Sequence, residues 1–307
     1  MDDKYPIIIV NPEHRIDNEQ MGSKRKFWFS ENTTAPQWLF KYPRLGSGEH
    51  WAEKIAEQIA LKLEIEHAEV ELAVCEDEQG IISKDFTGKN SSMVHGNDFM
   101  SISDIEYDLH KKFKQSQHTV ERIFKMLSNL DFTMTPYVRE NSNQFKFTKY
   151  LLFDALITNT DRHHENWGVV IKHIDCENFS SYEAYIAPSY DHASSLGREF
   201  TDIKRDAIRR NNGVAKYIER GHGAIFWDEK QPAPSPLELI RLCASNFPNL
   251  FTSSFTILTR IKESDFEHII SRIPDDWMSQ SARLFTNDLL CYNLAQLRTV
   301  QKNLPHL

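Results

Sequence analysis

The spacing of hydrophobic positions changes along this chain, and the change predicts where strands and helices lie. The first 80 residues hold short apolar runs between polar or turn-forming stretches, as β-strands do. We expect strands at 5–10, 27–30, 37–43 and 68–78, and the β-branched run at 5–10 has the composition of a buried strand. Between them, apolar residues recur every three or four positions over 46–65, which predicts a helix packed on the strands.

From about residue 102 the apolar positions follow a helical period, apart from one pair of strand-like runs. The expected helices are 119–130, 145–157, 234–247, 265–273 and 276–301. The runs at 167–173 and 182–188 have similar lengths and flank a polar loop, so they predict an antiparallel hairpin. Together these patterns predict an α+β fold in which residues 1–80 form a small β-rich lobe and residues 81–307 form a larger helical lobe.

Composition excludes several classes of protein. The chain has 307 residues, 40% hydrophobic and 26% charged, which is ordinary for a soluble globular protein. Its formal net charge of −8 argues against broad nucleic-acid binding through counterion release. The four cysteines stand far apart without a C-x-x-C pair, and no apolar run suits a signal peptide or a membrane span. We therefore expect a reduced, cytoplasmic protein with no structural zinc.

Titratable side chains crowd one short loop before the expected hairpin. Residues 161–166 read Asp-Arg-His-His-Glu-Asn. Asp161 and Asn166 have the spacing of a phosphotransferase catalytic loop, in which the carboxylate accepts the proton of the attacking hydroxyl and the amide oxygen holds magnesium. The same residue types recur in ordinary turns, so the spacing alone leaves both interpretations open. The hairpin favours the first, because its returning strand brings Asp191 beside Asn166, and such oxygen ligands suit Mg²⁺.

These segments resemble a known family. The run at 144–170 and the segment 190–197 are similar to the HipA-like serine/threonine kinases of bacteria, whose catalytic segment reads Asp-x-His-x-x-Asn. The resemblance implies a two-lobed, protein-kinase-like fold that binds ATP and Mg²⁺. The residues it assigns to the chemistry are Asp161 as the catalytic base, His163 as a further catalytic residue, and Asn166 and Asp191 as metal ligands.

The resemblance extends to the nucleotide-binding lobe. The residues it implies there are Gly22, Ser23 and Lys24 in a phosphate loop, Lys41 facing the phosphates, Glu53 on the next helix, and Val74, Cys75 and Glu76 in a hinge that touches the adenine. Glu53 would pair with Lys41, and Glu49 is the other carboxylate at the edge of that helix face. Both glutamates have a plainer interpretation as solvated helix residues. Many members carry an autophosphorylated serine three residues before the loop glycine, where this chain has Glu19.

The resemblance implies an ATP-dependent serine/threonine protein kinase of toxin type that phosphorylates a bacterial protein; whether it also phosphorylates itself is open because of Glu19. Full-length members begin with an additional small subdomain, whereas the first expected strand here starts almost at Met1. We therefore expect a short form that lacks this subdomain or receives it from a separate polypeptide. An antitoxin is the other expected partner, and no membrane partner is expected.

Two other functions are compatible with the sequence. A metal-dependent phosphohydrolase would gather acidic and histidine side chains around one or two metals, with no need for a phosphate-facing lysine. Its ligands would be Asp161, His163, His164, Asp191 and His192. A catalytically inactive member that only binds nucleotide or a partner would keep the fold, but it has no use for a catalytic base.

Overall fold

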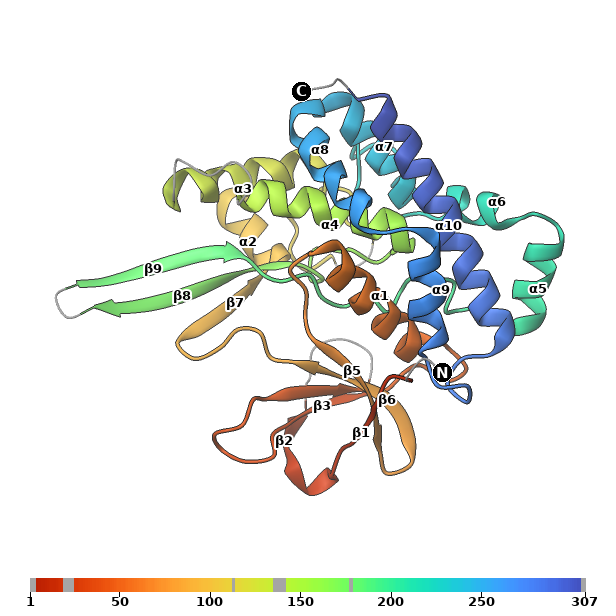
Figure 1. Cartoon of the computed structure of the whole chain (residues 1–307). Coiled ribbons are helices and arrows are strands. Elements are labelled where there is room, and N and C mark those ends of the chain that lie inside the picture. The colour runs from red at the N-terminus through yellow and green to blue at the C-terminus, as the bar shows by residue number, and fades with distance from the viewer. Residues whose placement is uncertain (1–3, 19–24, 112–113, 135–141, 177–178, 305–307) are drawn as a thin grey trace. The chain divides into compact units, whose positions relative to one another are not determined.

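Figure 1 shows the computed structural model of the chain. Its internal contacts divide the chain into two units. The structure describes residues 4–18, 25–111, 114–134, 142–176 and 179–304. Unit 1 consists of residues 1–86, 191–215 and 261–292, and unit 2 of residues 87–190, 216–260 and 293–307. Segments from the second half of the chain thus complete the unit that holds the N-terminal sheet. The lobe boundary at residue 80 stays a prediction.

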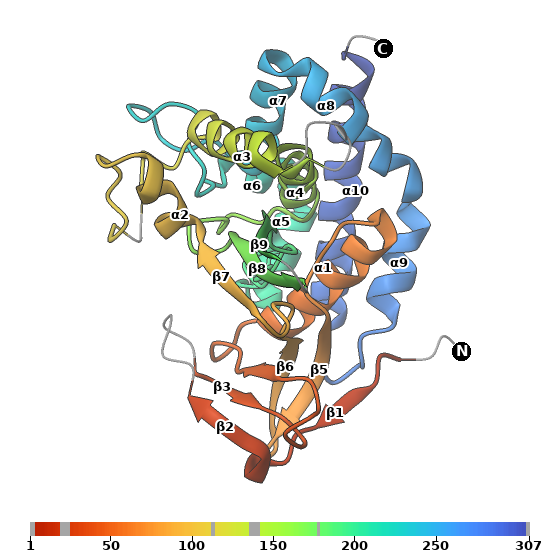
Figure 2. The same cartoon turned by 90° about the vertical axis from the view of Figure 1, so that its left-hand side faces the viewer.

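A six-stranded sheet forms the core of unit 1, in the order β1-β5-β6-β4-β3-β2 (Figure 2). Its strands are β1 (Ile7–Ile9), β2 (Arg15–Asn18), β3 (Lys26–Phe29), β4 (Trp38–Lys41), β5 (Val70–Cys75) and β6 (Glu78–Lys84), with the 3-10 helix η1 (Pro12–His14) before β2. Burial alternates along β3, and Phe27 of β3 and Phe40 of β4 lie in the core, where their rings stack with centroids 5.2 Å apart. The expected strands in β3, β4 and β5 are confirmed.

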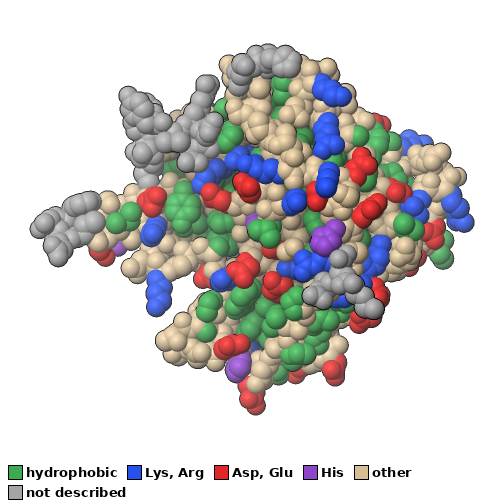
Figure 3. Space-filling view, viewed as in Figure 1, with side chains coloured by type: hydrophobic (Ala, Val, Ile, Leu, Met, Phe, Trp, Pro, Cys, Tyr) green, Lys and Arg blue, Asp and Glu red, His purple; other side chains and the backbone are tan. Residues whose placement is uncertain are grey.

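The first strand lies at the edge of the sheet, which corrects the expectation of a buried strand. Ile7, Ile8 and Ile9 are 37%, 38% and 80% exposed, whereas Tyr5 and Val10 beside them are buried. Hydrophobic side chains accordingly gather over β1 in Figure 3. A β-branched run predicts a strand but does not separate an edge strand from an interior one, because both have extended backbone.

Helices complete the core of unit 1. They are α1 (Glu49–Leu63), α5 (Asp202–Arg210), α9 (Glu263–Ser271) and the first part of α10 (Gln280–Lys302). The predicted helix at 46–65 corresponds to α1, which packs on β5, β6 and α9 and buries Ile55 and Ile59 completely.

The segment that begins at Asp191 is fixed against α10 by a tight turn. Leu196 and Gly197 have φ angles of 59° and 68°, in the left-handed region. The Thr286 hydroxyl donates to the Leu196 carbonyl oxygen at 3.3 Å. A Cβ atom at Gly197 would lie 2.4 Å from the Phe285 ring, so only glycine lets this turn approach α10 so closely.

Unit 2 is built around α4 (Asn143–Ile157), which is buried along most of its length. The other helices of this unit are α2 (Gly96–Ser103), α3 (Val120–Met134), most of α6 (Val214–Arg220), α7 (Pro236–Asn246), α8 (Pro248–Ser254), the 3-10 helix η3 (Phe255–Arg260) and the second part of α10. Ser142 caps α4 by accepting the Phe145 N–H at 3.1 Å, and Thr158 ends it with φ 54°. The predicted helical segments are confirmed.

A three-stranded antiparallel sheet completes unit 2. Its strands are β7 (Ser91–His95), β8 (Gly168–Cys176) and β9 (Phe179–Ile186). The β8–β9 pair is the predicted hairpin, paired from Val169 with Ile186 to Cys176 with Phe179. The α+β fold class, with a β-rich part and a helical part, is confirmed. None of the helices in the described ranges is long and apolar enough to cross a membrane.

The turn at Gly197 gives a stability prediction. We expect Gly197→Ala to lower the free energy of unfolding by about 2 to 4 kcal/mol, because it strains a left-handed backbone and displaces Phe285. Gly46→Ala is the matched control, since Gly46 has φ +72° and an added Cβ there would meet nothing within 4 Å. Urea unfolding measures both losses. Equal losses would show that close packing on α10 does not contribute.

Candidate active site

The loop that carries the predicted catalytic residues starts where α4 ends. Asn159 turns the chain there: its N–H donates to the Asp154 carbonyl oxygen at 2.8 Å, and its Nδ2 donates to Asp154 Oδ1 at 2.8 Å. The Asn159 side-chain oxygen in turn accepts the Asp161 N–H at 3.1 Å. The end of the helix therefore fixes the backbone of Asp161.

Arg162 lies beneath the loop and joins it to the end of α4. Its side chain is 2% exposed, and it binds both carboxylate oxygens of Asp154, through Nε at 2.8 Å and Nη2 at 2.7 Å. Nη2 also donates to Ser189 Oγ at 2.9 Å, while Nη1 donates to the carbonyl oxygens of Asn166 at 2.8 Å and Tyr190 at 3.2 Å. Burial lowers the pKa of Arg162, but the Asp154 carboxylate raises it more, so the guanidinium stays charged.

Asp161, His163 and Asn166 form the polar tip of the loop. The Asp161 side chain is 47% exposed. Asn166 Nδ2 donates to the Asp161 carbonyl oxygen at 2.7 Å, which turns the amide oxygen of Asn166 away from that bond. His163 Nδ1 accepts the Glu165 N–H at 3.2 Å, so the ring proton is on Nε2, which lies 4.0 Å from Asp161 Oδ1. The loop thus presents a carboxylate, an imidazole N–H and an amide oxygen.

The hairpin returns the chain to this loop, as its two equal strands predict. The Ala187 N–H donates to the Gly168 carbonyl oxygen at 2.9 Å, just beyond the paired strands. Arg162 then contacts the carbonyl groups of Asn166 and Tyr190 together. Tyr190 directly precedes Asp191 in the sequence.

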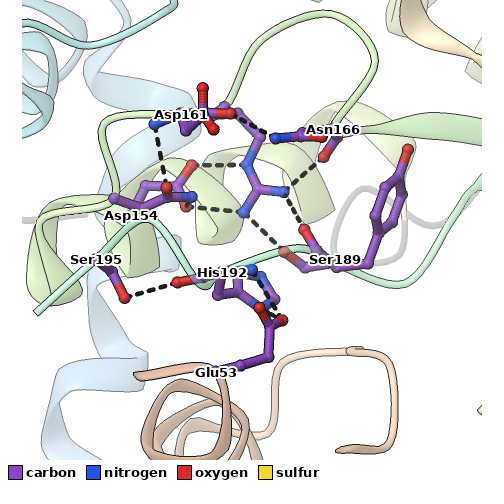
Figure 4. A network of polar contacts seen from close by, with 10 residues as sticks. Glu53, Asp154, Asp161, Asn166, Ser189, His192 and Ser195 are labelled. Carbon is purple, nitrogen blue, oxygen red and sulfur yellow. Dashed lines mark hydrogen bonds and ion pairs between the residues drawn. The ribbon is translucent and has the colours of Figure 1, made fainter. Parts of the chain in front are cut away.

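A second group of predicted residues lies together in unit 1. Lys41 Nζ is 3.8 Å from Asp191 Oδ1. Glu53 is 2% exposed, and its Oε1 accepts the His192 N–H at 2.8 Å (Figure 4). The predicted ion pair between Lys41 and Glu53 is therefore wrong: Lys41 pairs with Asp191, and Glu53 binds the backbone of the next residue. Glu49, the other carboxylate on this helix face, pairs with arginines.

Lys41 and Glu53 stay ionised despite their burial. Burial lowers the pKa of Lys41, but the charges of Asp191 and Glu53 raise it above its ordinary value. Burial raises the pKa of Glu53, but the hydrogen bond with His192 and the charge of Lys41 bring it below its ordinary value. Asp191 has φ 57°, a conformation that is uncommon for residues other than glycine and that recurs at functional sites.

The predicted hinge lies elsewhere in the chain. Val74 and Cys75 are the last residues of β5, and Glu76 and Asp77, with φ 51° and 64°, form the turn into β6. A hairpin within the sheet thus occupies the positions expected to join the lobes, so this expectation was wrong. The chain first passes from unit 1 to unit 2 after Phe86.

Gly22, Ser23 and Lys24, together with Glu19, lie outside the described residues. Their contacts with phosphate stay a prediction.

The residues predicted to bind a metal ion carry oxygen donors. Within the described ranges, no group of three or more His, Cys, Asp or Glu side chains could hold a metal. His164 is 1% exposed with Nδ1 2.7 Å from the Tyr107 hydroxyl, and His192 contacts a buried glutamate. The two residues predicted as metal ligands, Asn166 and Asp191, carry the oxygen donors that Mg²⁺ prefers, and their binding of a metal stays a prediction.

Arg162 and Asp154 are important site residues that were not predicted from the sequence. One signal was present. Asp154 is the lone charged residue in the apolar stretch LLFDALI, and a carboxylate buried in a helix core needs a cation. Arg162 is the first cationic residue after it.

Comparisons with solved structures show a kinase-like fold. The Helicobacter pylori proinflammatory kinase CtkA is similar with a TM-score of 0.74 and 16% identity, covering 97% of this chain and 98% of that chain. HipA of Shewanella oneidensis MR-1, in a complex with HipB and operator DNA, is similar with a TM-score of 0.58 and 16% identity, covering 97% of this chain and 70% of that chain. At these identities the similarity shows the fold alone.

Sequence comparison goes further than the fold. No curated protein has a matching sequence. Residues 17–242 match the HipA-like C-terminal domain, and the matched region includes both Asp161 and Asp191. Because this match covers most of the chain, the protein belongs to the family of the HipA-like C-terminal domain.

Proposed function

We propose that this chain is an ATP- and Mg²⁺-dependent kinase that transfers the γ-phosphoryl group of ATP to a serine or threonine hydroxyl of a protein. The observation that carries the proposal is the loop at 161–166, where Asp161 is exposed at the tip while Arg162 beneath it is buried. A general base must reach a hydroxyl while its own backbone stays fixed, and this loop does both. Membership of the HipA-like family supports the same chemistry.

In this proposal, Asp161 accepts the proton of the acceptor hydroxyl as that oxygen attacks the γ-phosphorus and ADP leaves. His163, whose Nε2 lies 4.0 Å from Asp161 Oδ1, is assigned to orient this carboxylate during the reaction. Asn166 and Asp191 hold Mg²⁺, which when bound neutralises charge on the phosphates.

The residues of unit 1 bind the nucleotide. Lys41, which is paired with Asp191, would bind the phosphates, and Asp191 would bind the metal ion. Glu53 acts indirectly, because it holds the His192 N–H and so the backbone beside Asp191. We assign the contact with the adenine to the segment at 85–87, where the chain first leaves unit 1, in place of the predicted hinge.

The acceptor and the partner are proposed only as classes. A toxin-like kinase controlled by a partner protein is supported by the Shewanella oneidensis HipA, which was solved with HipB and operator DNA. For this chain we propose either an antitoxin or a separate polypeptide that supplies a small subdomain. The net charge of −8 argues against direct binding of nucleic acid by this chain.

Substitution of the two aspartates should separate chemistry from binding. Asp161→Ala should lower the rate of phosphoryl transfer by about 10²- to 10⁴-fold with little change in ATP affinity, because the base acts on the acceptor hydroxyl. Asp191→Ala should also weaken Mg²⁺-dependent ATP binding, because it removes a metal ligand. Transfer of labelled phosphate to proteins of a bacterial extract and calorimetric titration with ATP measure the two effects.

Asp276→Ala is the control, since it removes an exposed carboxylate from a turn of unit 1, and it should change neither quantity. Equal, modest losses in the two test variants would contradict the separate roles. ATP binding without any transfer by the unmodified protein would indicate a catalytically inactive member.

Metal preference separates the kinase from a phosphohydrolase. ATP with Mg²⁺ should raise the melting temperature by a few degrees, roughly as expected for a ligand near 100 times its Kd, and ATP with a chelator should raise it less. Zn²⁺ alone should have little effect, because the metal ligands are oxygens. Thermal unfolding of the full chain measures all three. Strong stabilisation by Zn²⁺ and no response to ATP with Mg²⁺ would favour the phosphohydrolase.

A further inference from the structure

Backbone N–H groups at the junction of β7 and α2 bind carbonyl groups in and just after the loop at 161–166. The sequence of the junction does not reveal this role. The Gly96 N–H donates to the Trp167 carbonyl oxygen at 2.9 Å, and the Asn97 N–H donates to the His164 carbonyl oxygen at 3.0 Å. A Cβ atom at Gly96 would lie 2.4 Å from the Trp167 ring and 2.6 Å from the His164 carbonyl oxygen. The backbone at Gly96 therefore lies in direct contact with the loop, and there is no space for a side chain at this position.

The last residue of β7 meets the loop and the end of the hairpin at one point. His95 Nδ1 lies 3.0 Å from the Glu165 carbonyl oxygen and 3.2 Å from the Tyr190 hydroxyl oxygen. The Tyr190 hydroxyl donates to the same Glu165 carbonyl oxygen at 2.8 Å. Because a carbonyl oxygen only accepts, His95 Nδ1 carries a proton in this arrangement. Two donors from different elements thus hold one carbonyl group.

The Glu165 carbonyl group lies next in the chain to a proposed metal ligand. Glu165 directly precedes Asn166, and Tyr190 directly precedes Asp191. The bond from the Tyr190 hydroxyl to Glu165 therefore joins the residue before one proposed metal ligand to the residue before the other. His95 restrains both partners of that bond.

We propose that Tyr190 and His95 are positioning residues for Mg²⁺ binding, which set where the backbone enters Asn166 and Asp191. This inference rests on the kinase function proposed above. Neither side chain is assigned to the metal or to the reacting atoms; each acts through the Glu165 carbonyl group.

A second connection between the loop and the end of the hairpin should preserve the fold when the first is removed. Arg162 Nη1 also joins the two stretches, through the carbonyl oxygens of Asn166 and Tyr190. When the Tyr190 hydroxyl is removed, the hydrogen bonds of Arg162 remain. The loop should therefore open more often without unfolding the protein.

Tyr190→Phe in the full chain is the test. Without nucleotide, we expect hydrogen–deuterium exchange of the backbone amides at 163–167 to become about three- to tenfold faster, as for the loss of one hydrogen bond. The gain in ATP affinity that Mg²⁺ produces should fall by about three- to tenfold, while ATP affinity in chelator stays unchanged. His95→Phe removes the other donor and should shift both quantities in the same direction.

Tyr182→Phe is the matched control. Tyr182 lies on β9, is 67% exposed, and has no hydrogen bond from its hydroxyl to any described residue. The same loss of a hydroxyl there should change neither exchange at 163–167 nor the Mg²⁺-dependent gain.

Each contrary result has a distinct meaning. Unchanged exchange in Tyr190→Phe would overturn the positioning role. Faster exchange with an unchanged Mg²⁺-dependent gain would overturn the link to the metal. If the unmodified protein shows no Mg²⁺-dependent gain in ATP affinity, the proposed kinase function fails, and this inference fails with it.

Discussion

The buried ion pair between Arg162 and Asp154 is the interaction on which the rest of the loop depends. Removing both charges from water costs on the order of several kcal/mol for each ion, and only close geometry offsets that cost. The guanidinium group of Arg162 provides this close geometry, because its donors point outward in one fixed plane. One edge binds the Asp154 carboxylate at the end of α4, while Nη1 binds the carbonyl groups of Asn166 and Tyr190. The helix end, the loop and the hairpin end are therefore positioned by one rigid group.

The two carboxylates with a proposed chemical role are accessible, whereas the charged side chains that position them are buried. The side chains of Arg162 and Glu53 are each 2% exposed, whereas those of Asp161 and Asp191 are 47% and 32% exposed. Burial makes the supporting interactions strong and keeps their geometry fixed. Their exposure lets Asp161 and Asp191 reach the hydroxyl and the hydrated metal ion of the proposed reaction. The same division appears in both units, although different elements provide the supporting groups.

Local pattern predicted what depends on neighbours in the sequence. The helical period gave the helices, the two runs around residue 177 gave the β8–β9 hairpin, and the spacing of Asp161 and Asn166 gave the loop. The errors concern pairings that neither the order nor the period of the elements determines. The order of elements could not show that Val74–Glu76 ends a hairpin within the sheet. Likewise, helix periodicity put Glu53 on the right face but could not show that it would bind a backbone N–H instead of Lys41. Arg162 was missed because its partners are brought together only by the folded chain.

A double-mutant cycle on the free energy of unfolding tests most directly whether Arg162 and Asp154 act as one unit. Asp154→Leu and Arg162→Met should each cost about 3 to 5 kcal/mol, because each leaves a buried charge without its partner. The double variant should cost less than the sum of the two by about 1 to 3 kcal/mol, since neither charge remains. Strictly additive losses would contradict the account, because they would mean that the two side chains stabilise the fold independently.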